Sequence, residues 1–226
     1  MQKGGLHMAK RYQIKSSSFF MMGVICLIGF LTEYIILQLE QALYNKHYYS
    51  FTITESNMHW IIVCVRWGLI GLMMFYVTVR MYSFDLSKKR NAPKKRGIAA
   101  CLLLAAASVF LKLYVYGGWR IQLDIITSGW FQSIFQYVYY FFEIILATIT
   151  IAILQEWCES FCKNKNLPYG GIIFALTWGV SHIITQGNLL VGICYILLAL
   201  MFGMAFLFMN KNLLYTLIAV AVIFLV

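Results

Sequence analysis

Long apolar runs alternate with short polar segments along the whole chain. A membrane-spanning helix needs about 20 consecutive, mainly apolar residues. Seven runs come near to this length or exceed it, and they cover residues 18–38, 60–82, 98–116, 129–154, 170–186, 189–209 and 213–226. The pattern therefore predicts an all-α, polytopic transmembrane bundle of about seven helices.

A charged linker at residues 83–97 separates two predicted helices, 18–38 and 60–82, from the five that follow. Neither part is large enough to fold by itself, so we expect one transmembrane domain over residues 1–226. The chain has no evident internal repeat. It also lacks the paired, Gly-interrupted helices that mark many transporters.

Basic residues gather in alternate loops, which orients the predicted helices. With a cytoplasmic N-terminus, two basic residues fall in outer loops, namely Lys46 and Arg120. The cytoplasmic segments then hold Lys3, Lys10, Arg11, Lys15, Lys88, Lys89, Arg90, Lys94, Lys95, Arg96, Lys163, Lys165 and Lys211. The positive-inside rule thus predicts a multi-pass protein of the cell membrane with its N-terminus in the cytoplasm.

The composition excludes a soluble globular protein. Hydrophobic residues make up 62% of the chain and charged residues 12%, against about 25% charged in soluble domains. A net charge of +10 is compatible with nucleic acid binding. However, the basic residues lie between apolar runs, so we expect membrane lipid with anionic headgroups as the partner and no nucleic acid.

The cysteines give no indication of a metal site. Four of the six lie within apolar runs, where cysteine packs as a small core residue. Cys158 and Cys162 form a CxxxC pair without the second pair that a structural zinc site uses. Within the predicted spans, the possible ligands for a catalytic metal ion are Glu143, His182 and Cys194. We consider this set insufficient, so we expect neither a metal nor another cofactor.

Inserting an ionisable side chain into the membrane costs about 2–4 kcal/mol on insertion scales. Each such residue within an apolar run therefore requires a structural or functional explanation. Arg80 and Lys112 lie near the ends of their spans, and we expect them to snorkel toward water. Glu33 and Arg66 lie at similar depths below the outer ends of the first two spans. We expect them to form a structural ion pair.

Glu143 and His182 are predicted to lie at the same depth near the middle of the membrane. At 1.5 Å per residue, Glu143 is about 17 Å and His182 about 18 Å from the cytoplasmic end of its span. Residues at helical spacing share a face with them: Gln132, Gln136, Tyr140, Ala147 and Thr150 with Glu143, and Trp178 and Gln186 with His182. Two facing stripes of this kind would line a small wet cavity.

The chemistry of such a pair allows two interpretations. A carboxylate beside a histidine can take a proton from water and activate it for peptide hydrolysis. Alternatively, a hydrogen bond between Glu143 and His182 would only lock two helices together.

Residues 139–188 resemble the family of CAAX-prenyl proteases and bacteriocin-processing or self-immunity membrane proteins, known as CPBP or Abi. Members carry the motifs EExxxR, FxxxH and HxxxN on successive helices. The sequence from Trp178 to His182 matches the second motif, with Trp in the place of Phe. The likeness is good over about a quarter of the chain and looser over a core of residues 98–226.

The resemblance implies a helical bundle with its site inside the membrane, open to the cytoplasm. In the family, the glutamate and first histidine are thought to activate water. Glu143 is the best match for that glutamate, although Phe142 precedes it and the arginine is missing. Glu156, preceded by Gln155, is the other candidate, but it lies at the membrane edge.

The third motif is absent, because Ala219 and Val220 stand where its histidine is expected. Asn188, Tyr215 or a backbone N–H group would have to stabilise the oxyanion, and Trp178 and Gln186 would support the site. Three functions follow as alternatives. They are an intramembrane peptidase acting on a peptide or protein tail, a non-catalytic immunity or partner-binding protein of the membrane, and a small transporter that uses Glu143 as a proton relay.

Overall fold

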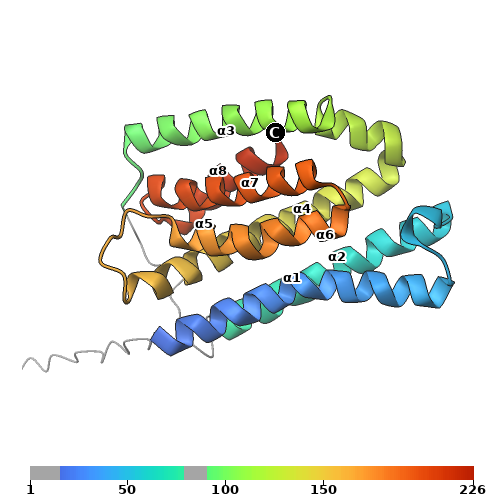
Figure 1. The fold of residues 1–226 in the computed structure, drawn as a ribbon, viewed down its shortest axis with the longest axis horizontal. Coiled ribbons are helices and arrows are strands. Elements are labelled where there is room, and N and C mark those ends of the chain that lie inside the picture. Colours follow the sequence, from blue (N-terminus) through green and yellow to red (C-terminus); the bar gives the residue numbers. More distant parts are fainter. Residues whose placement is uncertain (1–15, 79–90) are drawn as a thin grey trace, which may run out of the picture.

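The computed structural model describes residues 16–78 and 91–226, and over these residues it holds helices and no strands (Figure 1). The helices are α1 (Ser16–Tyr44), α2 (Ile53–Tyr76), α3 (Lys95–Tyr116), α4 (Arg120–Glu159), α5 (Tyr169–Phe174), α6 (Val180–Gln186), α7 (Leu189–Phe208) and α8 (Leu213–Leu225). A short 3₁₀ turn, η1 (Tyr48–Ser50), lies between α1 and α2, and a π-helical segment, η3 (Ala175–Gly179), joins α5 to α6. The predictions for Lys3, Lys10, Arg11, Lys15, Arg80, Lys88, Lys89 and Arg90 fall outside the described residues.

The all-helical bundle that the sequence predicts is confirmed. Each of the seven apolar runs corresponds to one helix once α5, η3 and α6 are counted as a single interrupted helix. Among the described residues, five helices are long and apolar enough to cross a membrane, namely α1, α2, α3, α4 and α7. These features define the class of the protein as a multi-pass helical membrane bundle.

Helices α1 and α2 extend further toward their shared turn than the apolar runs 18–38 and 60–82 indicate. A capping box starts α2 early, because the Thr52 hydroxyl accepts from the Glu55 amide while the Glu55 carboxylate accepts from the Thr52 amide at 2.7 Å. Lys46 donates to the same carboxylate at 2.9 Å. Such caps stabilise the first turn without any apolar residue.

Helix α4 is broken near its start by Gly129. The backbone there has φ 75° and ψ 167°, a conformation open almost only to glycine. The predicted span began at residue 129, so the preceding helical segment from Arg120 was not expected. It turns the chain from α3 into the long run of α4, as the bend in Figure 1 shows.

Helix α4 packs against both halves of the bundle. Its Tyr139 and Ile149 belong to an apolar cluster with α1 and α2. Its Ile144 and Ile151 belong to a second cluster with α3, α5, α7 and α8. In Figure 1, α4 accordingly runs between the α1–α2 pair and the helices that follow it.

Helices α5 and α7 approach each other through glycine. A Cβ atom placed on Gly171 would lie 2.6 Å from the Cα of Gly203, which is closer than real Cβ contacts. Small residues of this kind let membrane helices pack backbone to backbone. The contact holds the interrupted helix that carries Trp178 and His182 firmly against α7.

Candidate functional site

Glu143 of α4 lies in the interior of the bundle, with 3% of its surface exposed. The indole Nε1 of Trp178 donates a hydrogen bond to its Oε1 at 3.0 Å. Trp178 is itself buried, and its ring stacks on Phe174 of α5 at 4.9 Å between centroids. The indole therefore holds the carboxylate in a fixed position.

His182 lies one turn after Trp178 and is anchored by it. Its Nδ1 is 2.8 Å from the carbonyl oxygen of Trp178. Because a carbonyl only accepts, Nδ1 carries the proton in this contact, and Nε2 of the neutral ring is left as an acceptor. The imidazole also stacks on the ring of Tyr195 from α7, 3.8 Å between centroids.

The structure brings Glu143 and His182 to the same residue rather than to each other. Within the described residues, no direct hydrogen bond joins them. Both bond to Trp178, one to its side chain and the other to its backbone, and the indole and imidazole rings meet edge to face at 4.6 Å. The described contacts therefore form a Glu–Trp–His arrangement, with Trp178 bonded to both residues.

Trp178 lies within the π-helical segment η3. A π-helical turn inserts an extra residue into an α-helix, and such insertions occur frequently at functional sites. Here the insertion falls between Phe174, which packs under the indole, and His182. It sets the direction in which Trp178 points toward α4.

Glu33 and Arg66 form the ion pair that the sequence predicts, with Nη2 of Arg66 2.9 Å from Oε2 of Glu33. Arg66 also donates to the Thr32 hydroxyl at 2.7 Å. The indole of Trp67 donates to the same Glu33 oxygen at 3.1 Å. Arg66 is buried, whereas Glu33 is partly exposed. The pair therefore links α1 to α2 at the edge of the bundle.

This ion pair and Glu143 belong to one polar cluster. Arg66 interacts electrostatically with both carboxylates and with Tyr139, which lies one turn before Glu143 on α4. The Tyr139 ring contacts that of Trp67 at 5.6 Å between centroids. Glu143 therefore lies within the electrostatic influence of the Glu33–Arg66 ion pair, and the sequence analysis treated the two features as separate.

The other polar residues of α4 bond to groups other than Glu143. Gln132 donates to Asn57 of α2 at 3.1 Å, and Gln136 donates to the Tyr140 hydroxyl at 2.6 Å. Thr150 donates to the backbone oxygen of Leu146 in the preceding turn. Each of these groups has a hydrogen-bond partner on the protein, so a wet cavity along this face stays a prediction.

The remaining predicted site residues lie apart from Glu143. Gln186 ends α6 and is exposed. The side chain of Asn188 caps α7 by accepting from the amides of Leu190 and Val191 at 3.0 and 3.2 Å. Glu156 lies thirteen residues after Glu143 on α4, about 20 Å away along the helix.

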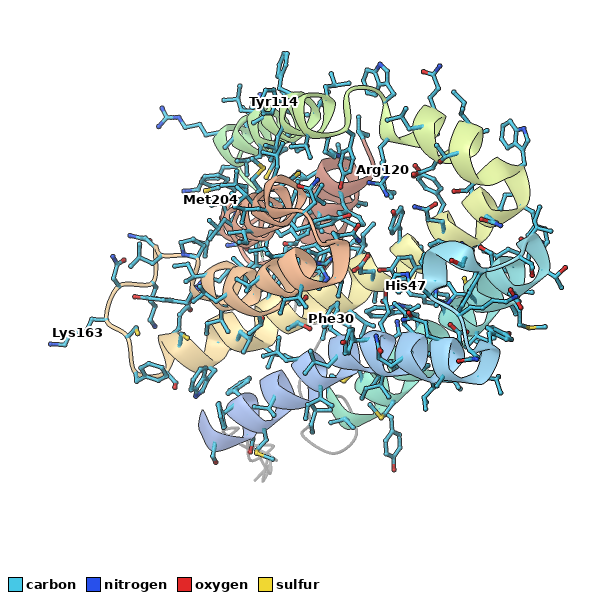
Figure 2. All side chains as sticks on the ribbon, turned by 45° about the vertical axis from the view of Figure 1, so that its right-hand side comes forward. Phe30, His47, Tyr114, Arg120, Lys163 and Met204 are labelled. Carbon is cyan, nitrogen blue, oxygen red and sulfur yellow. The ribbon has the colours of Figure 1, made fainter. Side chains whose placement is uncertain are left out.

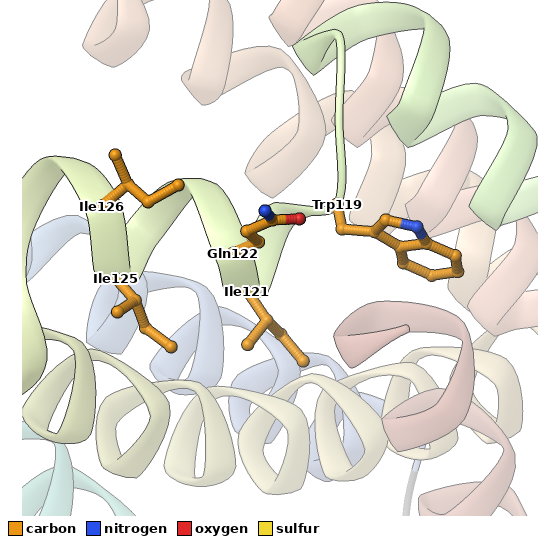
Figure 3. A pocket seen from close by; sticks show the side chains of 5 residues that line it. All are labelled: Trp119, Ile121, Gln122, Ile125 and Ile126. Atoms are coloured by element: carbon orange, nitrogen blue, oxygen red, sulfur yellow. The ribbon is translucent and has the colours of Figure 1, made fainter.

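Neither of two pockets formed by the described residues is lined by Glu143 or His182. The first lies beside the start of α4, between Trp119 and Ile126 (Figure 3). The second lies where α3 begins and α7 ends. Figure 2 shows Lys163 in the α4–α5 loop at one end of the bundle, and Arg120 where α3 gives way to α4.

Two buried contacts differ from the sequence analysis. His59 of α2 and Glu40 of α1 are both buried and form a hydrogen bond, which the sequence analysis did not anticipate. Both lie just outside the predicted spans, which is why they were missed. Lys112 does not snorkel, because it is buried and donates to the carbonyl oxygens of Ile223 and Phe224 at 3.0 and 3.1 Å.

Arg120 forms a second polar group at the start of α4. It pairs with Asp124 at 2.9 Å and donates to Tyr140 at 3.3 Å, and its guanidinium lies over the Tyr116 ring at 4.4 Å. These contacts partly cover a cation that was predicted to lie in a loop. Among the described residues, no three His, Cys, Asp or Glu side chains lie close enough to hold a metal ion.

Comparisons with protein-family models, with curated proteins and with solved structures found no match to the chain.

Proposed function

We propose that this chain is an intramembrane peptidase of the CPBP type, in which Glu143 is the general base and His182 assists it. The observation that carries the proposal is the Glu143–Trp178–His182 arrangement, which joins α4, η3 and α6 inside the bundle. Glu143 is buried within residues 98–226 and forms no hydrogen bond to a cationic side chain of the described residues. The arrangement links this carboxylate to Trp178 and His182, the residues of the FxxxH-like motif.

In this mechanism a water molecule enters beside Glu143 when the indole of Trp178 moves away. The carboxylate takes a proton from that water, and the water oxygen attacks the carbonyl carbon of the scissile peptide bond. Nε2 of His182 accepts a hydrogen bond from the water while Nδ1 stays on the Trp178 carbonyl. The proton then passes to the leaving amine as the C–N bond breaks.

The π-helical segment supplies the motion that this mechanism needs. Returning η3 to α-helical geometry would rotate Trp178 relative to Phe174 and release the carboxylate. The described state, with Glu143 covered, would then be the resting state of the enzyme.

The test uses the full chain reconstituted in lipid vesicles with a library of fluorogenic peptides. Glu143→Gln is expected to abolish cleavage, because an amide does not take up the proton of the water. Glu156→Gln is the matched control on the same helix and should cleave like the unchanged chain. Cleavage by Glu143→Gln at an undiminished rate would refute the proposal.

A second candidate is a non-catalytic membrane protein with an immunity or partner-binding role. It is favoured by the indole donor that already occupies the Glu143 carboxylate and by the missing third motif. In that case the unchanged chain cleaves no peptide. Glu143→Gln then lowers any biological activity only in proportion to the amount of folded protein that is lost.

A further inference from the structure

A pocket lies at the end of the bundle where α3 begins and α7 ends. Three segments that are distant in the sequence line it. They contribute Lys94 from the residues before α3, Lys165 and Asn166 from the α4–α5 loop, and Phe208 and Lys211 from the end of α7 and the turn after it.

The walls of this pocket are fixed to one another. The side-chain amide of Asn210 donates to the carbonyl oxygen of Ala92 at 2.9 Å, which ties the turn after α7 to the segment before α3. A Cβ atom on Gly97 would lie 2.2 Å from the carbonyl oxygen of Phe208, so α3 and α7 touch directly beneath the pocket. The depression is therefore part of the packed bundle.

The charge of the pocket is positive. Among the described residues, its lining holds three ammonium groups, those of Lys94, Lys165 and Lys211, and no carboxylate. Glu159 of α4 pairs with Lys211 from outside the lining and neutralises that one cation. Lys94 and Lys165 are exposed, and Glu159 is not paired with either of them, so an occupant with negative charge is favoured.

The backbone adds to this preference. Lys94 is the N-cap of α3, and no side chain caps that helix. The first amide groups of a helix point outward and carry the positive end of its dipole. Together with the lysines, the start of this 22-residue helix favours a phosphate group.

The position of the pocket indicates which kind of molecule carries the phosphate group. Both α3 and α7 are long and apolar enough to cross a membrane, so the residues where they end lie at the boundary between hydrocarbon and water. The half-exposed ring of Phe208 lies beside the cations. A phosphate group joined to an apolar tail matches both surfaces, whereas a free phosphate ion uses only the cations.

We infer that this pocket binds the headgroup phosphate of an anionic phospholipid, with the glycerol and the start of the acyl chains against Phe208. The site is independent of the proposed peptidase reaction. Basic pockets between transmembrane helices bind lipid headgroups by this combination of charge and depth.

The test measures lipid binding to the full chain in bilayers of phosphatidylcholine that contain spin-labelled phosphatidylglycerol or spin-labelled phosphatidylcholine. The unchanged chain should prefer the anionic lipid and hold one such molecule per chain. Lys94→Gln with Lys165→Gln should lower that preference about thirtyfold, because each lysine near an anionic surface contributes about 1 kcal/mol.

The matched control is Lys95→Gln with Lys163→Gln, which removes the same charge from the same two segments but from exposed positions outside the pocket lining. The control should keep most of the preference. An equal loss in both double variants would show a diffuse basic surface and overturn the inference.

A second arm separates the lipid from free phosphate. Millimolar inorganic phosphate at constant ionic strength should leave the bound phosphatidylglycerol in place. Displacement of the lipid by inorganic phosphate at these concentrations would show that the tail contributes nothing, and the lipid assignment would then be wrong. Circular dichroism of both double variants confirms that the helices are intact, so a loss of lipid does not reflect unfolding.

Discussion

Trp178 is the residue on which the candidate site depends. Its indole N–H satisfies the Glu143 carboxylate, and its backbone carbonyl orients His182. Its ring meanwhile stacks on Phe174. In the CPBP-like motif this position is expected to be Phe, which has the ring but not the donor. The donor is therefore the chemical difference between this chain and the motif.

Trp178→Phe should lower the free energy of unfolding by about 1–3 kcal/mol, because a buried carboxylate oxygen loses its donor while the stacked ring remains. Thermal unfolding in detergent micelles measures the effect. Trp130→Phe is the control, since Trp130 is 71% exposed and its loss should change little. Equal stability of Trp178→Phe and the unchanged chain would contradict a role for the indole bond.

Arg66→Met should destabilise the bundle by about 2 kcal/mol or more, since it leaves Glu33 without its ion-pair partner. The loss should be smaller than for a fully buried pair, because Glu33 is partly exposed. Adding Glu33→Gln should restore part of the stability, as the amide oxygen still accepts from Trp67. A double variant less stable than Arg66→Met would rule out this account.

Some of these contacts follow from the sequence and others do not. Helical depth was enough to predict the Glu33–Arg66 pair, because both positions could be counted from the ends of apolar runs. The same counting placed Glu143 and His182 at one level. It could not show that Trp178 stands between them, since the direction of the indole depends on the π-helical turn, which leaves no mark in the hydrophobic pattern.

At the scale of the elements, the break in α4 depends on one residue. Gly129→Ala should cost about 1–3 kcal/mol of stability, because the backbone there adopts a conformation that side chains disfavour. Crowding does not contribute, since a Cβ atom on Gly129 would meet nothing within 4 Å. Chemical denaturation in mixed micelles measures the change.

Gly71→Ala is the matched control for that experiment. Gly71 lies inside α2, and a Cβ atom there also meets nothing within 4 Å. Because alanine favours a regular helix by about 1 kcal/mol over glycine, this variant should be at least as stable as the unchanged chain. If both variants behaved alike, the special backbone at Gly129 would not be the cause.

The helix boundaries show how well the apolar pattern predicts where each helix begins and ends. Within the described residues it located part of every α-helix, but it missed the first segment of α4, from Arg120, and it ended α1 and began α2 too close to the apolar residues. The Thr52–Glu55 capping box and the buried Glu40–His59 pair extend both helices through polar sequence. A search for the T-x-x-E signature would have found the start of α2. The Glu40–His59 pair required knowledge of how the two helices align.

At the scale of the whole molecule, the predicted orientation can be tested by labelling. Asn45→Cys lies in the exposed turn after α1, and Lys163→Cys lies in the exposed α4–α5 loop. In intact cells, a membrane-impermeant maleimide should label Asn45→Cys alone, and Lys163→Cys only after permeabilisation. Both variants carry Cys162→Ser, which removes the native cysteine that is not buried. Labelling of Lys163→Cys in intact cells would reverse the assigned orientation.

Helix α4 contributes residues to both apolar clusters, so any movement of this helix affects the packing of both. A small rotation of this helix about its own axis would exchange contacts with α1 and α2 and, at the same moment, with α5 and α7. Packed interfaces of this kind switch between discrete arrangements rather than deforming gradually. Access to Glu143 would then be all-or-none, and a signal received by either half of the protein would reach the carboxylate through the same turn of α4.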